Sequence, residues 1–201
     1  MKEFTIKANS YLGMDIKGYY NCDYVGYQKS GNPDFINHLK NMTRKSSELD
    51  LVKDFMAVFE RTSEDLKEII KIEKLQDCVI VVAPRSKAEN HYKQSQLLFK
   101  KAVSCVADKM GFHNGSNAIK RIKDTKTTHS WRMENNTGDM PYVGITKDTC
   151  QIDKAKILSK DVILVDDIYT EGVFVAEDCI QTLLDLGAKS VILYVIAKTR
   201  G

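Results

Sequence analysis

Two adjacent carboxylates, Asp166 and Asp167, follow a short run of aliphatic residues, Val162 to Val165. Carboxylate oxygens accept hydrogen bonds from sugar hydroxyls and can also face the hydration shell of Mg²⁺. Ligands of open parallel sheets bind at the carboxyl ends of the strands. An acid pair in this position therefore favours a site for a sugar and its metal ion.

The turn Thr170-Glu171-Gly172 comes directly after this strand end and precedes an amphipathic segment. Backbone N–H groups at a helix start lack intrahelical partners, and the helix dipole stabilises a nearby anion by about 0.3 to 2 kcal/mol. Gly172 allows close approach of the backbone, and the Thr170 hydroxyl is a further donor. Together with the acids, the turn predicts a ribose 5-phosphate site. Simple capping of the helix by Asp167 or Thr170 is the alternative.

A second apolar run, Cys78 to Ala83, ends in the polar stretch Pro84-Arg85-Ser86-Lys87. A continuous apolar run of this length is typical of a strand that is buried on both faces of a parallel sheet. Two such strands therefore end in polar turns that lead into helices. Ligands of such sheets bind at these carboxyl ends, so both turns are candidates for one binding site.

The two strand ends resemble those of type I phosphoribosyltransferases. The stretch VILVDDIYTEG is similar to the superfamily's motif for phosphoribosyl pyrophosphate (PRPP). Within the superfamily, residues 78 to 197 resemble the ComF-type group, named for a competence protein. The matching positions after the proline and basic stretch are Tyr92, Gln94, Arg121, Thr125, Arg132, Asn135, Gly138 and Met140.

The resemblance implies a role for each part of the site. Asp166 and Asp167 would hold the ribose 2- and 3-hydroxyls and orient Mg²⁺ through the ribose or through water. The 5-phosphate would be held by Tyr169, Thr170, Glu171, Gly172, Val173 and Phe174. The pyrophosphate would be held by Pro84, Arg85, Ser86 and Lys87. Lys126 and Arg132 belong to a loop that would close over the substrate, which makes Asp166, Asp167 and Arg132 the implied catalytic residues.

Three features differ from the ComF-type pattern. The cysteine pairs of its N-terminal zinc finger are absent. Glu171 stands where the turn usually has a threonine, and Phe174 stands where a hydroxyl residue is usual. A carboxylate that faces a bound phosphate would weaken binding, and Phe174 cannot donate a hydrogen bond.

The implied function is transfer of the phosphoribosyl group of PRPP to an unidentified acceptor, with release of pyrophosphate. The alternative, which Glu171 and Phe174 favour, is a catalytically weak or inactive protein of the same fold. Such a protein would bind PRPP or a nucleotide and act as a regulator or as an accessory of DNA uptake. A nucleic-acid partner and a homodimer are compatible with the sequence, but the net charge of +3 requires neither.

Composition limits the remaining classes of protein. The chain has 201 residues, of which 43% are hydrophobic, enough for one sizeable core. No stretch reaches 18 apolar residues, so no membrane span is expected. The five cysteines include no CxxC pair, and no secretory leader is recognisable. These features predict reduced thiols and a cytoplasmic location.

The pattern of elements predicts an α/β fold with a mostly parallel, doubly wound sheet, as the resemblance also implies. Strands are expected over 78–83, 162–165 and 191–197, with short strands over 117–122 and 142–145. Helices are expected over 89–109 and 172–186, and a long flexible loop over 123–140.

The first 76 residues are expected to form a hood over a core of residues 77–201. Edge strands are expected within residues 1–30, followed by a helix capped by Asn32 that extends to about residue 41. Ser47 and Asp50 form the capping signal of a second helix that is expected to end near Arg61. A further short helix is expected over 63–75.

Overall fold

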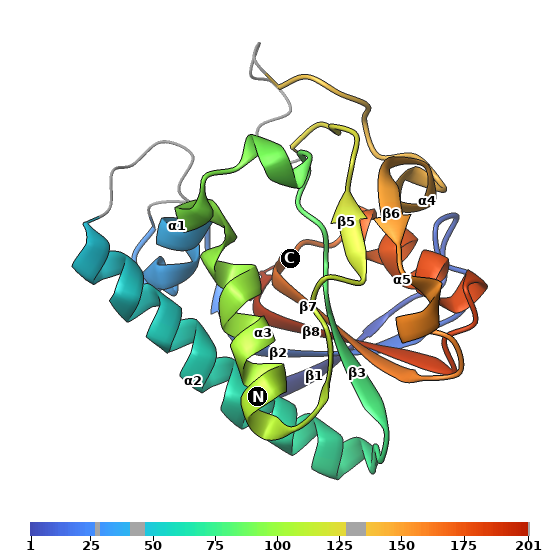
Figure 1. The fold of residues 1–201 in the computed structure, drawn as a ribbon, viewed down its shortest axis with the longest axis horizontal. Coiled ribbons are helices and arrows are strands. Elements are labelled where there is room, and N and C mark those ends of the chain that lie inside the picture. The colour runs from blue at the N-terminus through green and yellow to red at the C-terminus, as the bar shows by residue number, and fades with distance from the viewer. Residues whose placement is uncertain (27–28, 41–46, 128–135, 201) are drawn as a thin grey trace.

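The centre of the molecule is a six-stranded sheet (Figure 1). The computed structural model describes residues 1–26, 29–40, 47–127 and 136–200. The strand order is β1-β2-β8-β7-β3-β4, and every neighbouring pair is parallel except β1 with β2. The strands are β1 (Lys2–Ile6), β2 (Ile16–Tyr24), β3 (Cys78–Val82), β4 (His113–Gly115), β7 (Asp161–Tyr169) and β8 (Ser190–Thr199). The expected α/β fold with a mostly parallel sheet is confirmed.

The apolar strands alternate their side chains between two cores, one on each face of the sheet. In β3, Ile80 and Val82 belong to one core, whereas Val79 and Val81 belong to the other. Successive residues of a strand point to opposite faces, so a strand covered on both sides must be apolar throughout. This is why CVIVV and VILV are continuous apolar runs.

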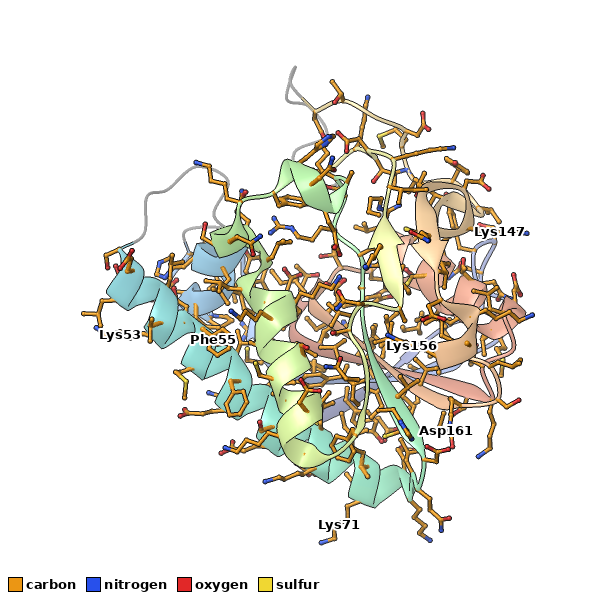
Figure 2. The ribbon with its side chains drawn as sticks, in the orientation of Figure 1. Lys53, Phe55, Lys71, Lys147, Lys156 and Asp161 are labelled. Atoms are coloured by element: carbon orange, nitrogen blue, oxygen red, sulfur yellow. The ribbon has the colours of Figure 1, made fainter. Side chains whose placement is uncertain are left out.

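Different helices cover the two faces. Side chains of α1 (Asp34–Lys40), α2 (Glu48–Glu73) and α3 (Leu98–Met110) form the first core. Side chains of α5 (Val175–Asp185) form part of the second core. Figure 1 shows α2 and α3 side by side, and Lys53 and Lys71 in Figure 2 mark the length of α2 along one side of the molecule.

Helix α2 is one continuous helix, so the expected end near Arg61 is wrong. The capping box at its start is confirmed, because the Ser47 side chain accepts from the Asp50 N–H and the Asp50 side chain accepts from the Ser47 N–H. Its buried positions Val58, Leu66 and Ile69 keep helical spacing across residues 61–63. Burial of these positions in the first core therefore continues through the region where a break between two helices was expected.

Helix α3 begins at Leu98, about nine residues later than expected. Two short 3₁₀ turns, η1 (Glu89–His91) and η2 (Gln94–Leu97), precede it. Tyr92 and Gln96 in this region contact Arg85, so the segment before α3 packs against the loop after β3. The helix ends at Met110, one residue beyond the expected end at 109, and Gly111 follows as its C-cap in a left-handed conformation with φ of 72°.

The segments between α3 and β7 differ in part from expectation. The strand expected over 117–122 is present as β5 (Ile119–Arg121), which pairs with β6 (Cys150–Ile152) in a separate antiparallel sheet. The strand expected over 142–145 is wrong, because this segment is a turn that leads into α4 (Ile145–Thr149). A short 3₁₀ turn, η4 (Lys154–Lys156), precedes β7.

The N-terminal residues contribute to the central sheet as well as to the helical layer. Strand β2 pairs in parallel with β8 over Gly18 to Tyr24, so β1 and β2 extend the same sheet as β3 and β7. The Asn32 side chain bonds to Val25 N–H and to the Gly26 and Lys29 carbonyls. It therefore closes the preceding turn, and its expected role as the cap of α1 is wrong.

Two further expectations concern membranes and thiols. None of the helices among the described residues is both long and apolar enough to span a membrane. All five cysteines, Cys22, Cys78, Cys105, Cys150 and Cys179, are free thiols.

Candidate functional site

The connections of the sheet diverge between β3 and β7. Strand β3 leads through α3 to β4 on one side, whereas β7 leads through α5 to β8 on the other side. The two helices cover opposite faces. A crevice opens between strands at such a switch point, at their carboxyl ends, and ligands of open α/β sheets bind there.

The sheet separates at this point. The last paired residues of β3 and β7 are Val82 and Val165, followed by a bond from the Ala83 N–H to the Val165 carbonyl. Strand β7 continues beside β8 as far as Tyr169. Asp166 and Asp167 therefore lie inside β7, not after its end as the sequence suggested, on the part of the strand that β3 no longer covers.

A pocket that is partly open to solvent occupies this position, and its volume of about 590 Å³ includes open solvent. Its polar lining includes Asp166 and Asp167 from β7 and Arg85 from the loop after β3. Apolar walls come from four places in the sequence: the end of β3 with the residues after it, helix α1, the junction of η2 and α3, and strand β5. These apolar lining residues are Val82, Ala83, Pro84, Ile36, Leu39, Leu97, Phe99 and Ile119. The structure thus brings Pro84, Arg85, Asp166 and Asp167 together.

The two acids bond to their own strand. Asp166 Oδ1 accepts from the Asp167 N–H at 2.8 Å, and Asp167 Oδ1 accepts from the Ile168 N–H at 2.7 Å. Both residues are half-buried. Asp161, at the start of β7, lies at the opposite end of this strand (Figure 2), where it bonds to Lys189 and Ser190. Asp166 and Asp167 therefore lie in the pocket lining, whereas Asp161 forms an ion pair with Lys189 at the other end of the strand.

The Arg85 side chain is directed by the 3₁₀ turns that follow it. Its guanidinium lies over the Tyr92 ring at 4.3 Å and donates to the Gln96 carbonyl at 2.5 Å. Its own carbonyl accepts from Arg121 Nε at 2.9 Å, and Arg121 is only 3% exposed. A buried cation on β5 thus fixes the main chain of the loop after β3.

Ser86 and Lys87 connect the same loop to the segment after β5. Ser86 Oγ lies 2.8 Å from Thr127 Oγ1, and the Ser86 carbonyl accepts from the N–H and the hydroxyl of Thr125. Lys87 Nζ donates to the Thr137 carbonyl. Neither Ser86 nor Lys87 lines the pocket. In this conformation both side chains hold the loop together.

A short stem joins residues 124–127 to residues 136–139. Thr125 and Asp139 form an isolated parallel bridge, and Thr127 and Asn136 exchange two hydrogen bonds of 2.7 and 2.8 Å. Gly138 has φ of +106°, and a Cβ there would lie 2.7 Å from the Asp124 carbonyl. Arg132 belongs to residues 128–135, which lie outside the described part of the chain.

Asp124 links the stem to the start of η1. Its Oδ1 accepts from the Ala88 N–H at 2.9 Å and lies 3.0 Å from His91 Nδ1. Burial alone would raise the pKa of Asp124, but the Ala88 N–H and His91 outweigh it and lower that pKa. The Lys87 N–H donates to the Tyr92 hydroxyl. The Lys87 amide of the expected pyrophosphate loop and the Ala88 amide directly after the loop are therefore already bonded to side chains.

The expected 5-phosphate turn begins with a buried tyrosine. The Tyr169 hydroxyl donates to Glu177 Oε1 at 2.8 Å, and Glu177 is 2% exposed. Burial raises the pKa of the Glu177 carboxyl, and the Tyr169 hydroxyl only partly opposes this shift. Burial also raises the pKa of Tyr169. Tyr169 therefore anchors the turn to α5.

The middle of the turn presents an unpaired hydroxyl and an exposed acid. Thr170 Oγ1 is buried and has no hydrogen-bond partner among the described residues. Glu171 is exposed, so its carboxylate is not packed into the turn. The Val173 N–H bonds back to the Thr170 carbonyl, and Gly172 has φ of +82°. These features fit a tight turn with glycine at its third position.

Helix α5 begins at Val175, three residues later than expected, and Phe174 is its N-cap. No side chain caps this end, so the alternative in which Asp167 or Thr170 caps the helix is wrong. Phe174 adopts φ of 62°, a left-handed conformation that costs a non-glycine residue about 1 to 2 kcal/mol. Its ring stacks on Tyr11 with centroids 4.8 Å apart and planes inclined by 2°.

Several residues that position the site were not assigned a role from the sequence. Ile36 and Leu39 reach the pocket from α1, and their signal was only the apolar spacing of a short helix. Arg121 matched the ComF-type pattern, but its burial is decided by β5. Asp124 and Tyr11 carried no local signal, because their partners Ala88 and Phe174 lie far away in the sequence.

The acid pair is compatible with Mg²⁺ that is bound mainly by a substrate. Mg²⁺ typically keeps several waters and takes one or two protein carboxylates together with phosphate oxygens. Among the described residues, no group of three or more His, Cys, Asp or Glu side chains could form a cage for a metal ion. Asp166 and Asp167 both line the pocket, and a pair of carboxylates suits a Mg²⁺ ion that takes its other ligands from phosphate oxygens and water.

No protein-family model matches the chain, and no curated protein is significantly similar to it.

Proposed function

We propose that this protein binds PRPP with Mg²⁺ and transfers the phosphoribosyl group to an acceptor, with release of pyrophosphate. The observation that carries the proposal is the pocket between β3 and β7, which gathers Arg85, Asp166 and Asp167 at the point where the sheet connections diverge. This is where a doubly wound sheet binds its ligands. The order of motifs, which resembles the type I phosphoribosyltransferases, agrees with this position.

In this proposal the acids of β7 receive the sugar. Asp166 and Asp167 each use Oδ1 for a neighbouring amide, which orients both carboxylates before a ligand arrives. Their role is to hold the ribose hydroxyls. Mg²⁺, when bound with the substrate, would neutralise charge on the pyrophosphate as the bond to the anomeric carbon breaks.

The loop after β3 takes the pyrophosphate and the turn after β7 takes the 5-phosphate. Arg85, held over Tyr92, provides positive charge in the lining of the pocket. Thr170 Oγ1, which is buried without a partner among the described residues, can donate to a phosphate oxygen. Preorganised positive charge at Arg85 would stabilise the charge that develops on the leaving pyrophosphate, whereas Thr170 would only hold the 5-phosphate in place.

The acceptor would enter from the side of α1 and α3. That wall is apolar, with Ile36 and Leu39 from α1 and Phe99 from α3. Ile36 and Leu39 lie within residues 1–76, so in this proposal the expected hood would contribute to the acceptor side of the pocket. An apolar wall excludes water, which would otherwise compete with the acceptor for the anomeric carbon.

The second candidate is a protein that binds PRPP or a nucleotide without efficient turnover, as a regulator or DNA-uptake accessory. Specific contacts favour it. The Lys87 side chain bonds to the Thr137 carbonyl, and the Lys87 and Ala88 amides are bonded to Tyr92 and Asp124. Phe174 gives the turn no hydroxyl. Turnover would require the loop to exchange some of these bonds for bonds to pyrophosphate.

Calorimetric titration with PRPP and Mg²⁺, together with thermal-shift measurements, tests the binding step. We expect saturable heat and a higher melting temperature, because a ligand that binds only the folded state stabilises it. Absence of both at millimolar PRPP would contradict the proposal.

Pyrophosphate release across a panel of bases and amines then separates the two candidates. Release that depends on one acceptor supports the transferase. If PRPP binds but no member of the panel causes release of pyrophosphate, the result supports the regulator.

A further inference from the structure

Phe174 occupies a conformation that its own side chain disfavours. It is the residue before α5, it has φ of 62° and ψ of 1°, and its carbonyl accepts the first helical bond, from the Asp178 N–H at 3.0 Å. Bulky residues rarely adopt this conformation unless the surrounding structure holds them in it. Something outside the turn must therefore fix Phe174.

The connection between β1 and β2 provides that support. The Tyr11 ring lies parallel to the Phe174 ring, with planes inclined by 2° and centroids 4.8 Å apart. The Tyr11 hydroxyl donates to the Pro141 carbonyl at 3.2 Å. The ring is thus held between the turn before α5 and the segment that leads to α4.

The backbone around Tyr11 is itself well fixed. Asn9 and Leu12 exchange two backbone hydrogen bonds, and the Tyr11 N–H donates to Asn9 Oδ1 at 2.8 Å. Leu12 is buried in the core that α5 helps to form. The Gly13 N–H donates to Gln181 Oε1 on α5 at 2.9 Å. The support is therefore anchored to the same helix whose start it fixes.

We propose that Tyr11 is a positioning residue of the phosphate turn, which holds Phe174 by ring stacking and so fixes the direction of the amides that open α5. The inference rests on the proposed function for the identity of the anion, a sugar phosphate. In this chain the ring stack takes over the orienting role that a side-chain cap has elsewhere, because α5 has no such cap.

The first test measures hydrogen exchange of the Asp178 amide in the ligand-free protein, for the wild type, Tyr11→Phe and Tyr11→Ala. Tyr11→Phe keeps the ring and should stay within about twofold of the wild type. Tyr11→Ala removes the ring and should raise the rate about tenfold or more, while the Leu183 amide further along α5 stays unchanged. Wild-type exchange at Asp178 in Tyr11→Ala would overturn the proposal.

The second test measures binding of ribose 5-phosphate by calorimetry with the same proteins and with Phe174→Gly. We expect Tyr11→Ala to weaken binding about fivefold or more and Tyr11→Phe to leave it unchanged. Glycine adopts this conformation without strain, so Tyr11→Ala should have a much smaller effect in the Phe174→Gly background. Equal effects in both backgrounds, or faster exchange with unchanged affinity, would overturn the role of Tyr11.

The two tests fail independently of each other. If the wild type binds neither ribose 5-phosphate nor PRPP, the proposed function is wrong, and the exchange of the Asp178 amide still decides whether Tyr11 fixes the turn.

Discussion

Arg121 Nε donates a hydrogen bond of 2.9 Å to the Arg85 carbonyl, so a buried cation fixes the loop that carries the expected pyrophosphate site. A second nitrogen of the same guanidinium donates to the Thr149 hydroxyl at the end of α4. Arg121 therefore joins the pocket to the small β5–β6 sheet. This contact suggests that the geometry of the pocket depends on a side chain that does not line it.

Arg121→Lys is expected to destabilise the protein by about 1 to 3 kcal/mol, because an ammonium group cannot reproduce both donors and leaves a buried acceptor unpaired. Urea unfolding measures the change. Lys120→Arg, at the neighbouring exposed position, is the matched control and should stay within about 0.5 kcal/mol of the wild type. Equal stability of the two variants would show that the Arg85 contact contributes little.

Asp167→Asn is expected to weaken PRPP binding about tenfold or more, equivalent to about 1.4 kcal/mol, through loss of a charged acceptor for the ribose hydroxyls. Asparagine retains an Oδ1 for the Ile168 amide, so the melting temperature should change little. Asp161→Asn, at the far end of the same strand, should leave PRPP affinity unchanged. If Asp167→Asn binds PRPP as tightly as the wild type, Asp167 does not hold the ribose hydroxyls.

Asp124→Asn is expected to change how stability depends on pH. The folded pKa of Asp124 lies below its ordinary value of 3.8, so the carboxylate contributes stability above that value and loses it as pH falls through the folded pKa. The difference in the free energy of unfolding between Asp124→Asn and the wild type should thus have its largest value at pH 6 and decrease steadily below pH 3.8. Urea unfolding at several pH values measures this difference. A difference in the free energy of unfolding that does not depend on pH would show that the charge of Asp124 does not contribute to stability.

Gly138→Ala is expected to weaken the stem between residues 124–127 and 136–139. A Cβ at Gly138 would lie 2.7 Å from the Asp124 carbonyl, and such overpacking typically costs about 1 to 3 kcal/mol. Gly31→Ala is the matched control, because Gly31 also has a positive φ but nothing lies within 4 Å of its Cβ position. Equal losses of stability in the two variants would mean that only the backbone conformation matters.

Tyr194→Phe is expected to cost about 1 to 3 kcal/mol, because the Tyr194 hydroxyl donates to the buried carboxylate of Asp65 at 2.8 Å. This bond joins β8 to α2, and Asn21 supplies the second donor to the same oxygen. Tyr20→Phe is the control in the adjacent strand β2. Thermal unfolding compares the two variants, and similar melting temperatures would contradict a structural role for the Asp65 contact.

The sequence by itself determined the alternation of elements and the two strand ends. The runs CVIVV and VILV predicted strands buried on both faces, because half-exposed strands and surface helices are not apolar throughout and the runs are short for a buried helix. The capping box of Ser47 and Asp50 and the stop at Gly111 were equally local, since their partners lie within a few residues. Features that depend only on residues close together in the sequence can be predicted before the fold is known.

Only the tertiary structure decided how the pocket is assembled. Helix α5 starts at Val175, after Phe174, whose ring stacks on Tyr11, a residue 163 positions earlier in the chain. The extra length of α2 and the burial of Arg121 likewise depend on surfaces that meet only when the sheet forms. The acids Asp166 and Asp167 could be recognised from their type and spacing, but their place inside β7, beside an uncovered edge, follows from where the pairing with β3 ends.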